Sequence, residues 1–209
     1  MLPVCHIVGA LPLSAPPAVR RGDLLIAADG GYRALKENGL LPDFCIGDFD
    51  SAPRPDGDNV LVFPTHKDDT DMLLAVKEGL LRGYRRFCLY GGVGGRLDHT
   101  VANFVTLAYL TEKGASGILI GGAENIAFLP CGQRLAFSAP RKDALFSVFP
   151  YGGDGVADLA GFAYGGKDVA FSSRFPLGVS NAFLGGDASF FAKKGDFLII
   201  TEEKIPFPS

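Results

Sequence analysis

Between residues 23 and 47 the chain reads DLLIAADGGYRALKENGLLPDFCIG, and this stretch predicts the fold of the first half of the protein. An apolar run over 23–28 indicates a strand that ends at a Gly-Gly pair. A helix is predicted over 32–38, with Gly39 as its C-cap. Residues 44–47 form the next apolar run. A strand, a helix and a second strand in this order predict two parallel strands covered by the helix.

The same alternation continues to about residue 120. Further strands are predicted over 4–8, 60–63, 86–90 and 117–120, and further helices over 70–82 and 97–113. Short apolar strands that alternate with helices are typical of a mainly parallel sheet with helices on both faces. We therefore expect an α/β N-terminal domain over residues 1–122.

The pattern changes after residue 122. Short strands separated by turn residues such as Tyr-Gly-Gly-Asp-Gly are predicted over 135–137, 144–149, 155–159, 168–171 and 197–201. No helix is predicted in this part. Strands at this spacing indicate an antiparallel sandwich or barrel. We expect residues 123–209 to form an all-β antiparallel sandwich domain.

Composition excludes several classes of protein. The 209 residues carry a net charge of −3 without a block of Lys or Arg, which argues against nucleic-acid binding. No run approaches the roughly 20 apolar residues of a membrane-spanning helix, and residues 1–9 lack a basic segment typical of a secretory signal. The four cysteines form no Cys-x-x-Cys pair, which favours free thiols. A cytoplasmic protein fits these features.

Polar segments follow four of the predicted strands. These segments are Asp29-Gly30-Gly31, Gly47-Asp48-Phe49-Asp50-Ser51, His66-Lys67-Asp68-Asp69-Thr70-Asp71 and Gly91-Gly92-Val93-Gly94-Gly95-Arg96-Leu97-Asp98-His99. Because ligands bind beyond the carboxyl ends of strands in open α/β sheets, we expect all four at one edge of the sheet.

The second and third segments lie in a stretch rich in aspartate. Residues 43–71 contain eight Asp, no Glu and two basic residues. Short carboxylates on turns suit Mg²⁺, which takes one or two of them together with phosphate oxygens. Asp also favours turns and helix N-termini, which accounts well for Asp43, Asp56 and Asp58. Asp68 and Asp69 are equally explained as helix-capping residues.

The fourth segment offers backbone amides at the start of a helix that could cradle a phosphate, although a glycine-rich turn from a strand to a helix also arises from packing. It is neither a Walker A motif nor a Gly-x-Gly-x-x-Gly fingerprint. Arg96 adds a planar donor suited to phosphate, although a solvated arginine is the alternative, and His99 taken alone is read as structural. The chain has no Gly-x-Ser-x-Gly elbow. Charge neutralisation and positioning, as in phosphoryl transfer, are therefore favoured.

In this order the four segments resemble the motifs of the thiamine pyrophosphokinase family. That family's pattern runs Asp-Gly-Gly, Gly-Asp-x-Asp-Ser, Lys-Asp-x-Thr-Asp and Gly-Gly-x-Gly-Gly-Arg-x-Asp-His. Residues 159–164 and 177–181 are similar to its Gly-Leu-x-Trp/Tyr and Gly-x-Ser-Asn segments. The resemblance implies transfer of pyrophosphate from ATP to the hydroxyl of thiamine, which gives thiamine diphosphate and AMP. It also implies a homodimer that binds thiamine between the nucleotide domain of one subunit and the sandwich of the other.

The resemblance also implies roles for individual residues. Mg²⁺ would be held by Asp48, Asp50 and Asp71. Catalysis would involve Asp71, Asp98 and Arg96. The residues implied for ATP are Asp29, Gly30, Lys67, Asp68, Thr70, Gly92, Gly94, Gly95, Arg96 and His99. Those implied for thiamine are Asp71, Asp98, Tyr164, Ser180 and Asn181.

Two departures from the family concern the thiamine side. The chain contains no Trp, so where relatives stack tryptophan on thiamine this protein must use a tyrosine, Tyr164, or do without. Phe162 replaces the usual leucine. Two alternatives therefore remain. One is a pterin pyrophosphokinase with a related nucleotide domain, and the other is a non-catalytic protein that binds a nucleotide or thiamine diphosphate.

Overall fold

The computed structural model describes residues 2–47, 59–62 and 69–208. The chain divides into two compact units, Met1–Gly122 and Ala123–Ser209. The predicted carboxylates Asp48 and Asp50, together with Lys67 and Asp68, lie outside the described residues.

The first unit contains a parallel sheet with the strand order β6-β5-β1-β2-β3-β4. Its strands are β1 (Cys5–Val8), β2 (Leu24–Ala28), β3 (Phe44–Gly47), β4 (Val60–Val62), β5 (Arg86–Tyr90) and β6 (Ser116–Ile120). Its helices are α1 (Gly31–Glu37), α2 (Asp71–Leu81) and α3 (Leu97–Glu112). Each of these elements was predicted from the sequence to within a few residues.

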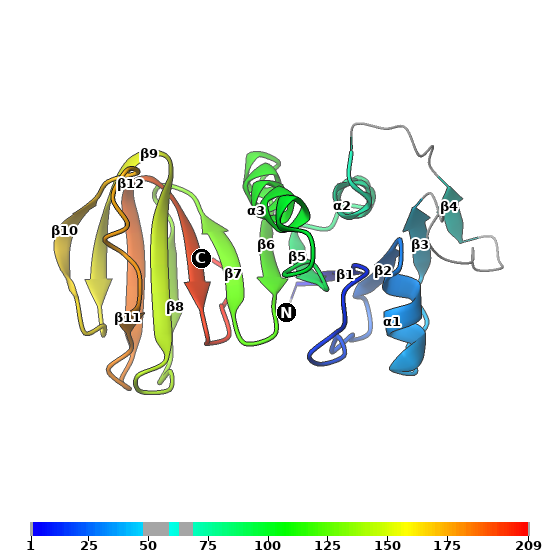
Figure 1. The fold of residues 1–209 in the computed structure, drawn as a ribbon, viewed down its shortest axis with the longest axis horizontal. Helices are drawn as coiled ribbons and strands as arrows, with labels where there is room; N and C mark the ends of the chain where they lie inside the picture. The colour runs from blue at the N-terminus through cyan, green and yellow to red at the C-terminus, as the bar shows by residue number, and fades with distance from the viewer. Residues whose placement is uncertain (1, 48–58, 63–68, 209) are drawn as a thin grey trace. The chain divides into compact units, whose positions relative to one another are not determined.

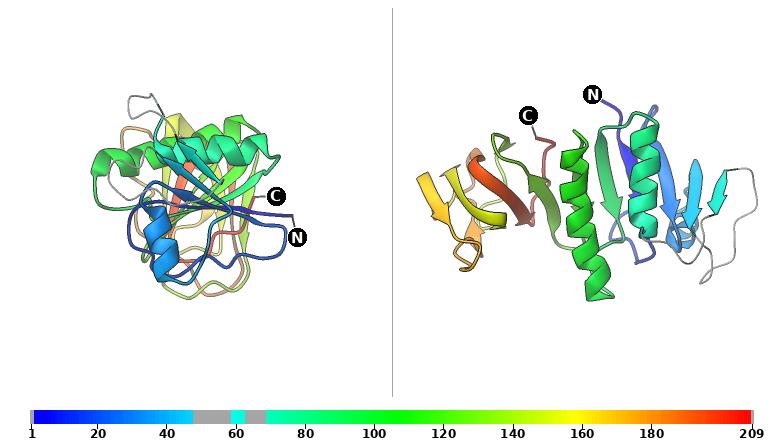
Figure 2. Two further views of the ribbon diagram at one scale, coloured as in Figure 1. Left: turned by 90° about the vertical axis from the view of Figure 1, so that its right-hand side faces the viewer. Right: turned by 90° about the horizontal axis from the view of Figure 1, so that it is seen from above.

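Helices cover both faces of this sheet. Helices α2 and α3 lie on one face and α1 lies on the other (Figures 1 and 2). Every residue of β1 and β2 is buried, which explains why β2 is continuously apolar and why β1 is apolar except for His6. On the α1 face, Leu35 packs with Val8, Leu25 and Ala27 in one core cluster.

A close approach of backbone segments fixes the start of α1. A Cβ atom on Gly31 would lie 1.9 Å from the carbonyl oxygen of Val8, so no other residue fits there without moving the helix or the strand. The Gly-Gly pair is thus required by the packing of α1 against the end of β1. This close packing places the residues after β1 and β2 next to each other.

The second unit is all β, and its strand pairs are antiparallel. Its strands are β7 (Asn125–Leu129), β8 (Arg134–Phe137), β9 (Leu145–Ala160), β10 (Gly166–Phe171), β11 (Asn181–Ala182) and β12 (Ala188–Thr201). The strand β12 pairs with β9 along most of its length, and also with β7 at one end and β8 at the other. The two long strands therefore organise this unit.

Part of the sequence interpretation of this unit was wrong. Residues 144–149 and 155–159 were predicted as separate strands, but β9 runs continuously through the Tyr-Gly-Gly-Asp-Gly segment. The predicted strand over 197–201 is only the last part of β12, and β7 and β11 were not predicted. The reason is the pairing with β12, whose register shifts between Ala192 and Asp196 let both strands bend without breaking.

Phenylalanines fill the core of the second unit. Phe146, Phe183, Phe190 and Phe197 are fully buried. The ring of Phe190 lies 5.8 Å from that of Phe146 and 5.1 Å from that of Phe197, so it connects the two halves of the bent strands. Edge-to-face and tilted pairs of this kind stabilise a core beyond the area that they bury.

Two further predictions from the sequence concern membrane-spanning helices and the state of the cysteines. Among the described residues, no helix is long and apolar enough to cross a membrane. The four cysteines, all within the described part of the chain, are free: Cys5 and Cys45 are buried, Cys88 is half-buried and Cys131 is exposed.

Candidate active site

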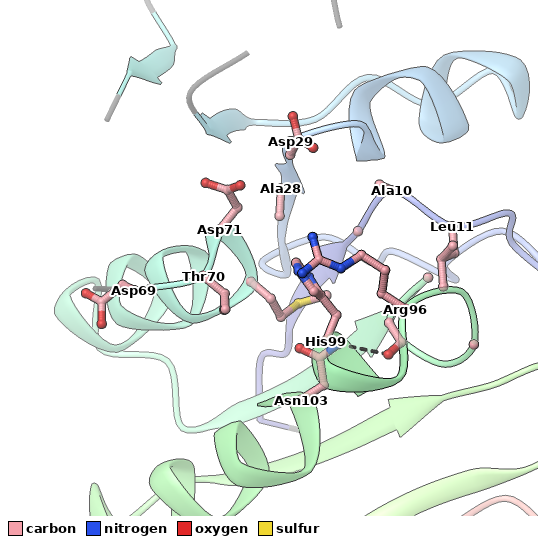
Figure 3. Close-up of a pocket in the computed structure, with 15 residues that line it drawn as sticks. Ala10, Leu11, Ala28, Asp29, Asp69, Thr70, Asp71, Arg96, His99 and Asn103 are labelled. Carbon is pink, nitrogen blue, oxygen red and sulfur yellow. Dashed lines mark hydrogen bonds between the residues drawn. The ribbon is translucent and has the colours of Figure 1, made fainter. Parts of the chain in front are cut away.

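A pocket of about 630 Å³ opens at the carboxyl ends of β1, β2 and β5 (Figure 3). The N-termini of α2 and α3 also contribute to it. Its lining residues are Gly9, Ala10, Leu11, Ala28, Asp29, Asp69, Thr70, Asp71, Met72, Gly91, Gly92, Gly94, Arg96, His99 and Asn103. The structure thus brings together three of the four polar segments predicted to meet. The remaining segment, residues 47–51, falls largely outside the described residues.

Asp29 follows β2 directly and enters the pocket from the turn before α1. Its backbone has a φ of 47°, a left-handed conformation that Asp tolerates better than most residues. Its N–H donates to the carbonyl of Ile46 at 2.7 Å, which fixes the turn to β3. A Cβ on Gly47 would lie 3.1 Å from the Cα of Asp29, so the small residue at the end of β3 permits this close approach.

The N-terminus of α2 places a second carboxylate in the pocket. Thr70 caps the helix, because its Oγ1 accepts from the N–H of Leu73 at 3.2 Å. Asp71 is the first helical residue, and its carboxylate lies on the same side of the pocket as that of Asp29 (Figure 3). Thr70 was predicted as a nucleotide-binding residue, and the structure gives its side chain a capping bond.

Asp69 differs from Asp71 although only one residue separates them. Its carboxylate turns away from the middle of the pocket (Figure 3) and accepts a hydrogen bond from Lys77 Nζ at 2.6 Å. That pairing raises the pKa of Lys77. The structure therefore distinguishes a carboxylate engaged with its own helix from one that faces the cavity, a distinction that the sequence left open.

The glycine-rich segment forms the opposite wall. Gly91, Gly94 and Gly95 have φ angles of 62°, 95° and 61°, which favour glycine. A Cβ on Gly91 would lie 2.7 Å from the carbonyl oxygen of Leu11. The turn is therefore held close to the segment after β1, and its glycines are needed for this geometry.

Two side chains of α3 hold this turn, and the sequence interpretation missed both. The buried Asn103 donates from Nδ2 to the carbonyl of Gly92 at 2.8 Å. Thr100 Oγ1 accepts from the N–H of Gly94 at 3.2 Å and lies 3.1 Å from its carbonyl oxygen. A signal was present, because Thr100 and Asn103 lie three residues apart and therefore on the same face of the helix.

Arg96 lines the pocket from the N-cap position of α3. Its guanidinium forms a forked pair with Asp98, with an NH2-to-Oδ2 distance of 2.6 Å and an Nε-to-Oδ1 distance of 3.2 Å. The hydrogen bond from Arg96 lowers the pKa of Asp98, and the same bond raises the pKa of Arg96. Both side chains are exposed, so an incoming phosphate could compete for the arginine.

The remaining predicted residues of this unit are placed as follows. Gly30 is the N-cap of α1. His99 is exposed and lines the pocket, and its N–H donates to Asp98 Oδ1. Gly95 and Asp98 are neighbours of lining residues in the sequence but do not themselves line the pocket. Asp98, however, lies within hydrogen-bonding distance of a lining residue, Arg96.

The predicted metal ligand Asp71 lies within the described residues and lines the pocket. Within residues 2–47, 59–62 and 69–208, no group of three or more His, Cys, Asp or Glu residues could hold a metal ion. Two of the three predicted ligands lie outside this part of the chain. The carboxylates of Asp29 and Asp71 are nevertheless hard oxygen donors on one side of the pocket, a donor type that fits Mg²⁺ together with phosphate oxygens.

Three of the residues predicted to face thiamine, Tyr164, Ser180 and Asn181, lie in the second unit. Tyr164 has 79% of its surface exposed. Asn181 is buried, and its side chain bonds the backbone of Tyr164. Ser180 has a φ of 58°, and its N–H donates to Ser147 Oγ at 3.0 Å. These three residues are therefore neighbours, as the sequence interpretation required.

Fold and pocket together define a class of protein: an α/β domain whose parallel sheet carries an aspartate-lined and glycine-lined pocket beyond its strands, joined to an all-β unit. Residues 17–119 match the family model of the thiamin pyrophosphokinase catalytic domain. This range contains the pocket except for its contributions from residues 9–11. The match confirms the resemblance to the thiamine pyrophosphokinase family that the sequence motifs indicated.

Individual proteins of this family are similar to the chain over most of its length. Thiamine pyrophosphokinase from Bacillus subtilis is 25% identical over 185 residues, which cover 85% of this chain and 86% of the relative. A crystal structure of thiamine pyrophosphokinase from the same organism superposes with a TM-score of 0.85 at 23% identity, covering 96% and 98% of the two chains. Thiamin pyrophosphokinase from Candida albicans gives a TM-score of 0.78 at 15% identity, covering 95% and 88%.

Proposed function

We propose that the protein is a thiamine pyrophosphokinase, which transfers the pyrophosphoryl group of ATP to the hydroxyl of thiamine and releases AMP. The observation that carries the proposal is the pocket at the carboxyl ends of the parallel strands. There the carboxylates of Asp29 and Asp71 stand opposite a glycine-rich turn and Arg96. These residues fall within the part of the chain that matches the catalytic-domain family model.

The reaction balances as a nucleophilic substitution at phosphorus. The hydroxyl oxygen of thiamine forms a bond with the β-phosphorus of ATP, and the bond between that phosphorus and the oxygen bridging to the α-phosphate breaks. AMP leaves with the bridging oxygen, and the proton of the hydroxyl passes to a nearby base. Asp71 and Asp98 are the candidate bases. Such reactions need positioned groups and charge stabilisation more than covalent help from the protein.

The glycine-rich turn and Arg96 would hold the phosphates. Backbone N–H groups at the start of α3 favour negative charge, which the helix dipole also stabilises. The guanidinium of Arg96 is already oriented by Asp98 at 2.6 Å and is exposed. In the nucleotide complex it would exchange this partner, at least in part, for a phosphate oxygen. Gly92, Gly94 and Gly95 would permit the close approach of the polyphosphate.

Magnesium fits the remaining groups. Asp71 would hold the ion together with Asp48 and Asp50, and Asp29 would stand beside it. When bound, Mg²⁺ neutralises charge on the phosphates and makes the β-phosphorus more electrophilic. Gly30, Lys67, Asp68, Thr70 and His99 would complete the nucleotide site, either by contact or, for Thr70, by holding α2 in place.

The second unit would supply the thiamine side and the contacts of a homodimer. Its long antiparallel strands β9 and β12 carry a core of phenylalanines, which supports this proposal. The exposed ring of Tyr164 would lie against the cationic thiazolium ring of thiamine, a contact of about 1 kcal/mol. The proposed assignment is thus a nucleotide-binding domain over residues 1–122 and a thiamine-binding and dimerisation domain over 123–209, in a cytoplasmic enzyme.

The test compares possible acceptors of the pyrophosphoryl group by measuring one product, AMP. The protein is incubated with ATP and Mg²⁺, and AMP is measured with thiamine, with a hydroxymethyl pterin, and without an acceptor. Thiamine-dependent AMP is the expected result. AMP that depends on the pterin instead would favour a pterin pyrophosphokinase. Calorimetric binding of thiamine or nucleotide without any AMP would favour a non-catalytic binding protein, and both results contradict the proposal.

A further inference from the structure

Tyr164 combines an exposed ring with a tightly bound backbone. Its surface is 79% exposed, and it lies in the turn between β9 and β10. Its N–H donates to Asn181 Oδ1 at 3.0 Å, and its carbonyl accepts from Asn181 Nδ2 at 2.9 Å. A single side-chain amide therefore binds the backbone of this residue on both sides.

The amide of Asn181 is committed to this task. The residue is only 7% exposed, and its Oδ1 also accepts from the N–H of Ala182 at 2.9 Å. Both acceptor positions of the oxygen and one N–H of the amide are thus used within the protein. Little of the group remains available to a ligand, so direct contact with a substrate is not its best explanation.

Neighbouring backbone hydrogen bonds join the segment that contains Asn181 to the turn that contains Tyr164. The N–H of Ala163 donates to the carbonyl of Ala182 at 2.8 Å, and that of Leu184 donates to Gly161 at 3.0 Å. Between them Phe162 forms an isolated bridge with Phe183, and their rings lie 4.8 Å apart in the core. The turn is therefore anchored to the core while only its tip is exposed.

We infer that Asn181 is a positioning residue that presents the ring of Tyr164, in a fixed orientation, to an organic cation. The inference rests on the proposed function, in which this cation is thiamine. An exposed aromatic side chain on a free turn would lose conformational entropy when a ligand stacks on it. A turn that is already held loses less, which is the physical advantage of preorganisation. Asn181 acts through Tyr164 and does not touch the substrate.

The first test separates action through Tyr164 from direct contact. Asn181→Ala should raise the KM for thiamine about fivefold, because about 1 kcal/mol of hydrogen bonding is lost, and should change kcat and the KM for ATP less than twofold. In a Tyr164→Ala background the same substitution should have no further effect on the KM for thiamine. A full fivefold effect in that background would overturn the inference, because Asn181 would then act independently of the ring.

Asn125 provides a matched control. Its Nδ2 donates to the carbonyl of Glu203 at 2.9 Å, so it also joins a side-chain amide to the backbone within the second unit. Asn125→Ala should leave the KM for thiamine unchanged. Equal increases in the two variants would show a general effect on the unit and would contradict the inference. If Asn181→Ala does not fold, Asn181→Asp replaces it, since the carboxylate keeps both acceptor bonds and sets an oxygen that repels the Tyr164 carbonyl in place of the donor.

A spectroscopic test needs no ligand. Because the chain has no Trp, Tyr164→Trp introduces a single reporter at the tip of the turn. Its steady-state fluorescence anisotropy should fall when Asn181→Ala is added and should not fall with Asn125→Ala. Unchanged anisotropy would overturn the positioning role even if thiamine binds. Conversely, failure of the wild-type protein to bind thiamine in calorimetry would refute the proposed function, while the anisotropy comparison would still test the positioning.

Discussion

The two units of this protein present functional groups in different ways. In the first unit the pocket is made from turns that follow parallel strands, and glycines such as Gly31 and Gly91 allow backbone segments to approach within van der Waals contact. In the second unit one exposed ring, Tyr164, stands on a turn that is anchored to a phenylalanine core. In the first unit the backbone geometry of the pocket depends on glycines without side chains, whereas in the second unit the position of the exposed ring depends on the packing of side chains.

This difference matches the chemistry proposed for each unit. Phosphate groups are bound by backbone N–H groups and fixed charges, which require close approach and leave no room for a Cβ. An organic cation needs a broad aromatic face, which must be held at the surface against the tendency of apolar groups to be buried. We expect substitutions in the two units to affect different steps of the reaction.

The largest effect is expected at Asp71. Asp71→Asn removes a charge that, in the proposed function, would act on phosphate and metal, and it should lower kcat about a thousandfold without unfolding the protein. Asp69→Asn is the control, because that carboxylate precedes α2 and is paired with Lys77 of that helix. Steady-state rates of AMP formation and thermal unfolding midpoints check both variants. A normal rate for Asp71→Asn would refute its assigned role.

Gly31 tests the close packing of the first unit. An added Cβ would lie 1.9 Å from the carbonyl oxygen of Val8, so Gly31→Ala should destabilise the protein by about 3 kcal/mol or more. Gly122, whose Cβ position has no atom within 4 Å, serves as the control, and Gly122→Ala should change stability by less than about 0.5 kcal/mol. Urea unfolding measures both changes. Similar stabilities of the two variants would contradict the packing explanation.

Tyr164 provides the corresponding test in the second unit. Tyr164→Ala should raise the KM for thiamine about tenfold, while Tyr164→Phe, which keeps the ring, should change it less than threefold. Neither should alter the KM for ATP. An increase in the KM for ATP, with that for thiamine unchanged, would reverse the roles that we assign to the units.

The smallest effect concerns a buried group away from the pocket. His6 Nδ1 lies 3.1 Å from Tyr90 Oη, and its Nε2 lies 3.4 Å from Asp23 Oδ2. Burial lowers the pKa of His6 below its ordinary value of 6.5, although hydrogen bonding to Asp23 opposes this shift. Burial by itself would raise the pKa of Asp23, but N–H donors from Val4 and Arg20 outweigh it, and the net shift is downward.

Both shifts have the same consequence for stability. A group whose pKa is lower in the folded state stabilises the fold above its unfolded pKa, and this contribution is lost as the pH falls. The free energy of unfolding should therefore decrease as the pH falls below 6.5, and His6→Gln should reduce this slope. Urea unfolding at pH 7.5, 6.5 and 5.5 checks the prediction, which an identical slope in the variant would contradict.

The difference between the two units also explains how much of the fold could be predicted from the sequence. Every strand and helix described in the first unit was predicted, because apolar runs, helical spacing and turn glycines are local signals. In the second unit β9 was predicted as two separate strands, because it is continuous only through its pairing with β12. The strand β7 was not predicted. Long-range pairing of this kind leaves little trace in a local pattern.

The candidate site shows the same limit. Asp29, Asp71 and Arg96 were predicted, because motifs after strands converge at one edge of a parallel sheet. Asn103 was not, because its function is to bind the carbonyl of Gly92, a contact between residues eleven apart that only the fold creates. Likewise, only the structure shows that Asn181 binds the backbone of Tyr164.

The most direct test of the proposed reaction follows the phosphorus atoms. The protein is incubated with thiamine, Mg²⁺ and ATP labelled in separate samples at the α- or the β-phosphate, and the products are separated. We predict that the β-label appears in thiamine diphosphate and the α-label in AMP, in equal amounts. A β-label that appears only in ADP or inorganic phosphate, with no labelled thiamine ester, would contradict pyrophosphoryl transfer to thiamine.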